Sequence, residues 1–251
     1  MRIMFLGKAP NGDRAYDRSH VVQLIKSYGS PGTEIDLANP EPFAGSQIGA
    51  LTGRQSKLNG LDHMVGAGAI IQKALWAAEN GYDVVVQSNT FDPGVDGGRM
   101  VCTIPIIGPF RTSVHVASIL ADRIGIVVPL ASHVPLVWRM LRSVGMKDHV
   151  VDIRAHGIYG SDISERKEEI TGVTLKVIEG LVRDGAEAII PLGGALIPYI
   201  VDPADLEAQW GVQVLNIAQL SIKFAETCVN MGLKQSGFTY PLADLTSADF
   251  A

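Results

Sequence analysis

The chain has 251 residues, enough for one large domain or two small ones, and either choice can bury a substantial core. Hydrophobic residues make up 47% and charged residues 19%, a balance typical of a compact soluble protein with room for an oligomer interface. The net charge of −5 argues against a nucleic-acid partner, and no apolar run reaches the roughly 18 residues that a membrane span needs.

The start of the chain reads as a strand and not as a targeting segment. Met1 to Gly7 is not followed by an apolar signal core with a small-residue cleavage site. We therefore expect a cytoplasmic protein. From the apolar composition we also expect a homo-oligomer.

Cysteine usage points away from metal and disulfide chemistry. Cys102 and Cys228 lie far apart and form no CxxC pattern, so buried reduced thiols are expected. No His or Cys pair has the spacing of zinc ligands. We expect neither a metal nor a cofactor.

Short apolar runs alternate with longer helical patterns along the chain. The runs are continuous Val, Ile and Leu segments, as in strands that are buried on both faces of a parallel sheet. Strands are predicted at 2–7, 33–38, 83–88, 103–108, 123–129, 149–154, 187–192 and 212–216, and helices at 61–80, 132–145, 164–184 and 217–232. Gly185 is predicted to close the third of these helices.

Two strand-to-turn segments resemble each other, Val84 to Gly94 and Ala188 to Leu196, and each is followed by a second short apolar run. This duplication predicts an α/β fold of two pseudo-symmetric doubly wound units, each with a mostly four-stranded parallel sheet and with an active-site cleft between them. The halves are expected at 1–112 and 113–220. The carboxy-terminal helix and tail, 221–251, are expected to pack back on the first half.

At its strand ends the chain resembles the aspartate/glutamate/hydantoin racemase superfamily, and most closely its hydantoin racemase-like branch. The segments that carry the resemblance are Met1–Ile3 with Pro10-Asn11, Gly81–Val86 with Phe91–Gly94, Gly185–Gly193, and the helix from Lys223–Glu226 through Met231–Leu233. Members of that family place one cysteine on each turn, one to remove the α proton and the other to return a proton. Here Asn89 stands at the first cysteine position and Gly194 at the second.

Neither Asn89 nor Gly194 can exchange a proton near neutral pH, so racemisation by two cysteines is not expected. A turn at the end of a parallel strand still offers backbone N–H groups that bind a carboxylate or an oxyanion. Candidate binding residues are Asn89, Ser88 and Thr90 on the first turn, Gly193, Gly194 and Ala195 on the second, and Lys8 and Asn11 after the first strand. A small anionic or carbonyl-bearing substrate would suit them; ordinary polar turns are the alternative.

Other side chains are candidates to replace the missing acid and base. His133 and His156 follow predicted strands, and histidine has the unperturbed pKa for proton transfer at neutral pH; Tyr159 would donate a hydrogen bond. Arg111 would pair with a substrate carboxylate or form a salt bridge between the halves. His63 and His115 are expected to be structural or on the surface, and Asp92 before Pro93 is expected to cap a helix.

Three functions therefore remain open. The favoured one is a cysteine-independent isomerase or lyase on a small carboxylate or hydantoin-like substrate, working through an anion-stabilising site. The second is a hydrolase of a small amide, imide or ester that uses Ser88, Thr90 or an activated water. No G-x-S-x-G motif surrounds those two residues. The third is a binding protein without catalysis.

Overall fold

The computed structural model describes residues 1–10, 18–46, 48, 60–158, 166–193 and 197–250. The chain divides into two compact units. Unit 1 comprises Met1–Gly49, Leu61–Pro109 and Ala218–Ala251, and unit 2 comprises Ala50–Gly60 and Phe110–Ile217.

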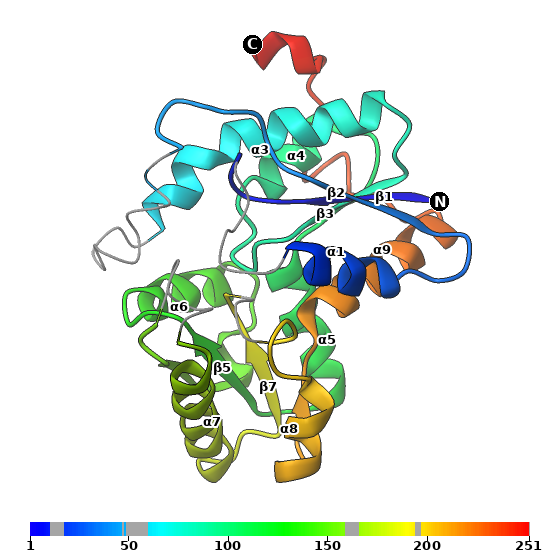
Figure 1. Cartoon of the computed structure of the whole chain (residues 1–251). Helices are drawn as coiled ribbons and strands as arrows, with labels where there is room; N and C mark the ends of the chain where they lie inside the picture. The colour runs from blue at the N-terminus through cyan, green and yellow to red at the C-terminus, as the bar shows by residue number, and fades with distance from the viewer. Residues whose placement is uncertain (11–17, 47, 49–59, 159–165, 194–196, 251) are drawn as a thin grey trace. The chain divides into compact units, whose positions relative to one another are not determined.

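Unit 1 is built on a parallel sheet of four strands in the order β2-β1-β3-β4. The strands are β1 (Arg2–Leu6), β2 (Glu34–Ala38), β3 (Val84–Gln87) and β4 (Ile106–Ile107). Figure 1 shows α3 (Leu61–Glu79) and α4 (Val95–Val101) on one face of this sheet, and α1 (Arg18–Ser27) and α9 (Ile217–Asn230) on the other. All residues of β3 are buried, as the apolar run predicted for a strand covered on both faces.

The tail of unit 1 packs on the same unit. Ala243 N–H donates to the carbonyl oxygen of Met100 at 2.7 Å, and Ser247 N–H donates to Glu79 Oε1 at 2.9 Å. A short 3₁₀ helix, η4 (Ser247–Phe250), follows, and Phe250 packs against the core between α3 and the sheet. The tail thereby covers part of α3 and α4.

Unit 2 repeats the architecture with the order β6-β5-β7-β8, again parallel throughout. Its strands are β5 (Ile124–Val128), β6 (Val150–Ala155), β7 (Ala188–Pro191) and β8 (Gln213–Val214). Its helices are α5 (Pro109–Leu120, of which Pro109 belongs to unit 1), α6 (His133–Ser143), η2 (Lys147–His149), α7 (Lys167–Arg183) and α8 (Pro203–Trp210). In Figure 1, α6 and α7 lie on one side of β5 and β7, and α5 and α8 lie on the other.

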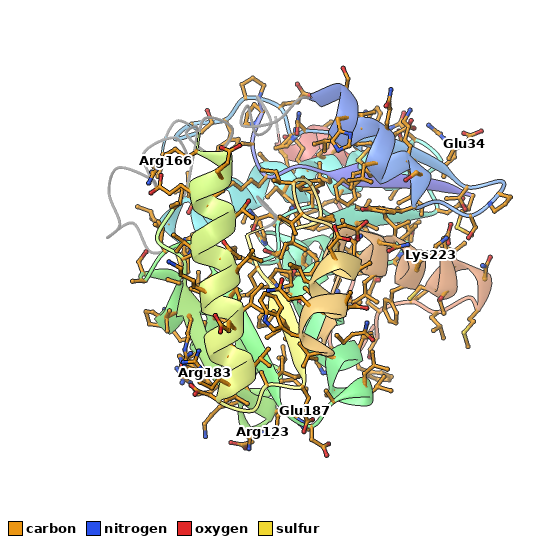
Figure 2. The ribbon with its side chains drawn as sticks, turned by 60° about the horizontal axis from the view of Figure 1, so that its bottom comes forward. Glu34, Arg123, Arg166, Arg183, Glu187 and Lys223 are labelled. Atoms are coloured by element: carbon orange, nitrogen blue, oxygen red, sulfur yellow. The ribbon has the colours of Figure 1, made fainter. Side chains whose placement is uncertain are left out.

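The amino ends of β5 and β7 are tied by Glu187. Its Oε2 accepts the backbone N–H groups of Asp122 and Arg123 at 3.0 and 3.3 Å. Figure 2 shows Arg123 and Glu187 at the same end of unit 2 as Arg183, the last residue of α7. Gly185, predicted to close this helix, has a φ of 93° just after the C-cap Asp184.

The predicted fold class is confirmed: two α/β units each carry a four-stranded parallel sheet. The fourth and eighth strands are shorter than predicted, at two residues each, because only those residues pair with the neighbouring strand. Among the described helices, none combines the length and the apolar character that a membrane crossing requires.

Candidate functional site

The turn after β3 is held from inside by Gln87, the last residue of the strand. The Gln87 side chain is 1% exposed; its Oε1 accepts the N–H of Asn89 at 2.9 Å, and its Nε2 donates to the carbonyl oxygen of Pro93 at 3.2 Å. These two bonds set the path of the backbone between residues 88 and 94. Sequence reasoning missed Gln87, although a polar residue ending an apolar strand was the available signal.

Asn89 is oriented by the same turn. Its Oδ1 accepts the N–H of Phe91 at 3.0 Å, which is an Asx turn. Because the oxygen is engaged, the amide nitrogen Nδ2 is left as the donor, and it donates to no residue in the described part of the chain. Ser88 is half-buried and Thr90 is buried. The three predicted residues therefore lie together at the carboxyl edge of the unit 1 sheet.

The prediction that Asp92 caps a helix is wrong. Asp92 has a φ of 50° and Gly94 a φ of 71°, and this left-handed backbone delays the start of α4 to Val95. Gly94 is the N-cap, and no side chain caps the helix. The Asp92 carboxylate lies instead against Gly108, where an added Cβ would overlap it. Such left-handed non-glycine residues persist where the surrounding structure holds them, often at functional sites.

In unit 2 the corresponding turn follows β7. Leu192 N–H donates to the carbonyl oxygen of Val127 at 2.9 Å, which continues the sheet up to the turn. Gly193 has a φ of 91°, and a Cβ at this position would overlap the Pro129 ring, so only glycine fits without a shift. Gly194 and Ala195 lie outside the described residues, as do Asn11 and Tyr159.

His133 and His156 lie at the carboxyl edge of the unit 2 sheet. His133 is the first residue of α6 and is 2% exposed; His156 directly follows β6 and is 9% exposed. His156 N–H donates to the carbonyl oxygen of Val128 at 3.0 Å, and Gly157 N–H donates to that of Pro129 at 2.7 Å. The ends of β5 and β6 thus hold both rings at one edge.

The expected proton-transfer role of His156 at neutral pH needs correction. Burial, and secondly the charge of His133, lower the pKa of His156 to about 4, so its ring is neutral at pH 7. Its Nδ1 accepts the N–H of Ile158 at 3.4 Å, which leaves Nε2 to carry the proton. His156 is therefore fitted to donate a hydrogen bond.

The two predicted cationic residues have different surroundings. Lys8 Nζ lies 3.1 Å from Asp62 Oδ2, and this carboxylate is 5% exposed. Sequence reasoning did not identify Asp62, because the pairing joins the end of β1 to the start of α3. Arg111 is half-buried in the first turn of α5, and its carbonyl oxygen accepts a hydrogen bond from His115 Nδ1 at 2.8 Å. His115 is exposed, as its surface assignment predicted.

Both thiols lie in the interior of the protein, away from the turn. Cys102 is 2% exposed, precedes β4 and therefore lies at the amino edge of the sheet, whereas Asn89 lies at the carboxyl edge. Burial, and secondly the charge of Glu79, raise the pKa of Cys102 to about 12. Cys228 lies within α9, is 6% exposed, and burial raises its pKa as well. The predicted buried, reduced thiols are confirmed.

The amino-acid sequence of the chain is similar to those of known racemases. The family model Asp/Glu/hydantoin racemase matches residues 10–225. A hydantoin racemase of Pseudomonas sp. (strain NS671) is 33% identical over 178 residues, which is 70% of each chain. A hydantoin racemase of Rhizobium meliloti is 27% identical over 213 residues, which is 83% of each chain.

Solved structures share the fold at lower identity. The crystal structure of allantoin racemase from Pseudomonas fluorescens has a TM-score of 0.80 at 21% identity and covers 98% of each chain. The crystal structure of arylmalonate decarboxylase has a TM-score of 0.62 at 11% identity over 96% of this chain and 99% of that one. With the family model covering most of the sequence, the chain belongs to the Asp/Glu/hydantoin racemase family.

Proposed function

We propose that this chain is a cysteine-independent, isomerase-type enzyme that acts on a small carboxylate or hydantoin-like substrate by stabilising an enolate. The observation that carries the proposal is the orientation of Asn89. Its oxygen is held by the Phe91 N–H, and its amide nitrogen is left as a donor. Relatives named hydantoin racemase support the substrate class.

The chemistry follows from where charge develops. Removal of a proton next to a carbonyl group moves negative charge onto the carbonyl oxygen. A donor that is already oriented stabilises this charge without reorganisation, and one such donor is worth about 100-fold to 1000-fold in rate. Asn89 Nδ2 and the Ser88 hydroxyl are the donors that the β3 turn contributes in this proposal.

The two unit 2 histidines take different roles. With a pKa of about 4, His156 stays neutral and acts as a hydrogen-bond donor through Nε2. His133 is the unit 2 candidate for moving a proton, and the Gly193 turn after β7 is proposed to contribute to substrate binding. Arg111 is proposed to bind a carboxylate of the substrate.

The thiols have no part in this reaction. Both are buried and have raised pKa values, so neither supplies a thiolate at neutral pH. A lyase reaction is the near alternative, because loss of carbon dioxide from a malonate-like substrate gives the same enolate. Arylmalonate decarboxylase shares the fold.

The test is proton exchange in D₂O. The probes are both enantiomers of 5-benzylhydantoin, both enantiomers of allantoin, and achiral phenylmalonate. Each is incubated with the chain and followed by ¹H NMR. With at least one probe we expect a reaction: loss of the α-proton signal from a hydantoin or allantoin, or decarboxylation of phenylmalonate. Asn89→Ala should lower the rate about 100-fold or more. Asn230→Ala, an exposed asparagine at the end of α9, should leave it unchanged.

Three outcomes would contradict the proposal. Ring opening of a hydantoin without any α-proton exchange would identify a hydrolase. Tight binding of the probes without any turnover would identify a binding protein. An Asn89→Ala variant as active as the wild-type chain would remove Asn89 from the mechanism.

A further inference from the structure

Four side chains of unit 1 form a cluster at the carboxyl edge of its sheet: Lys8, Asp62, His63 and Phe91, called here the His63 cluster. Asp62 Oδ2 lies 3.1 Å from Lys8 Nζ and 3.6 Å from His63 Nε2. The His63 ring stacks on the Phe91 ring, with centroids 5.1 Å apart and an interplanar angle of 26°. One carboxylate and one aromatic ring thus fix the imidazole.

Burial makes these contacts strong. The Asp62 side chain is 5% exposed and that of His63 is 10% exposed, so the carboxylate and the imidazole interact with little screening by water. Lys8 neutralises the buried carboxylate, and Asp62 lies in the first turn of α3, where the helix dipole also favours a negative charge. An ion pair that served stability alone would need Lys8 and Asp62 but not the stacked histidine.

The cluster is joined to the Asn89 turn. Phe91 supports the His63 ring through its side chain, and its backbone N–H donates to Asn89 Oδ1. The same residue therefore orients a candidate oxyanion donor and a candidate acid–base group. A general base held by a carboxylate, and linked through Phe91 to a hydrogen-bond donor, suits enolate formation.

We propose that His63 is the proton-transfer residue of unit 1 and that Asp62 is its positioning residue. This inference rests on the function proposed above. The imidazole takes the α proton of one enantiomer, and the electron pair of the broken C–H bond enters the enolate. The enolate collapses when its carbon receives a proton, either from the protonated His63 ring on the same face, which gives exchange, or from a second carrier on the opposite face, which gives inversion. No oxidant, reductant or further reactant takes part. Lys8 balances the charge of Asp62.

The test uses the enantiomers of 5-benzylhydantoin separately in D₂O. His63→Gln keeps a hydrogen-bonding side chain but cannot carry a proton. Where one carrier serves each face of the carbon, its loss stops exchange of one enantiomer only. We expect the exchange rate of that enantiomer to fall about 100-fold or more, and the exchange rate of the other enantiomer to fall less than about 10-fold. His20→Gln, an exposed histidine of α1, should change neither.

Asp62→Asn is the second variant and serves if His63→Gln does not fold. We expect kcat to fall about 10-fold or more with KM within about 3-fold, because orientation and not binding is lost. The acid limb of the pH–rate profile should move to lower pH, since the carboxylate that favours a protonated ring is gone.

The outcomes separate the two proposals. If the wild-type chain exchanges no probe, the proposed function falls and this inference falls with it. Suppose that the wild-type chain catalyses exchange, but His63→Gln lowers the exchange of both enantiomers equally or of neither. The proposed function then stands, and His63 is structural. An unchanged pH profile in Asp62→Asn would likewise overturn the positioning role.

Discussion

At the scale of single residues, Gln87 holds the turn that orients the Asn89 side chain. Its buried amide spans the turn, accepting from Asn89 and donating to Pro93. A buried polar group is tolerated because both of its ends are satisfied, and each partner would lose its own hydrogen bond if Gln87 were removed. The conformation of the turn therefore depends on the last residue of the preceding strand, β3.

Gln87→Leu should test this role. The substitution leaves the Asn89 N–H and the Pro93 carbonyl oxygen without their partner, and we expect a loss of about 1–3 kcal/mol in the free energy of unfolding. Urea denaturation followed by circular dichroism measures it. Gln23→Leu in α1, where Gln23 is exposed, should stay within about 0.5 kcal/mol of the wild-type chain. Equal effects of the two substitutions would disprove the bracing role.

Residue identity at the turn was predictable, but residue geometry was not. The spacing to Asp92 placed Asn89 on the turn, and the apolar run before it placed the strand. The sequence could not indicate the left-handed backbone at Asp92, whose carboxylate lies against Gly108 after β4 in the folded chain. Nor could it bring His63 to Phe91, because that contact joins α3 to the turn after β3.

At the scale of secondary-structure elements, Glu226 ties α9 to the loop that precedes β2. Its carboxylate accepts from the Ser30 N–H at 2.6 Å, the Ser30 hydroxyl at 2.8 Å and the Thr33 hydroxyl at 2.7 Å. Lys223, labelled in Figure 2, lies 3.0 Å from the same carboxylate. Burial alone would raise the pKa of Glu226, but these hydrogen bonds outweigh it and lower the pKa to about 2.

The stability of the chain should therefore depend on Glu226 and on pH. A carboxyl group whose pKa falls from 4.5 unfolded to about 2 folded contributes about 3 kcal/mol above pH 5, and this is lost as the pH falls through about 2. We expect Glu226→Gln to be less stable than the wild-type chain at pH 6. The gap should narrow by about 2 kcal/mol at pH 3.

Urea denaturation at both pH values measures this effect. Glu179→Gln is the matched control, because the Glu179–Arg183 pair on α7 is exposed and should contribute less than about 0.5 kcal/mol. A gap between the Glu226→Gln variant and the wild-type chain that is the same at pH 6 and pH 3 would show that the contribution of Glu226 does not come from its ionised form.

At the scale of the whole molecule, the duplication seen in the sequence has a structural counterpart. In both units the strand that ends in a candidate turn, β3 or β7, is the third in sheet order, and it is flanked by the unit's first strand and by a two-residue last strand. Continuous apolar runs made this topology predictable, because buried parallel strands have few other sequence patterns. Packing of the tail on the first half was expected from the sequence, but its contacts were not predictable. They join groups far apart in the chain, such as Gln235 Nε2 with the Cys102 carbonyl oxygen and Ser247 N–H with Glu79 Oε1.

The whole chain should function without any thiol. A variant with both Cys102→Ala and Cys228→Ala removes two buried side chains, so we expect lower stability, by about 1–3 kcal/mol in total. Exchange of the active hydantoin probe should stay within about 3-fold of the wild-type rate, since neither thiol belongs to the proposed site and burial raises both pKa values. Iodoacetamide should label neither cysteine in the folded wild-type chain and both in urea. If iodoacetamide abolished exchange and substrate protected against it, a thiolate would be part of the reaction, and the assignment of Asn89 to the first cysteine position would have to be abandoned.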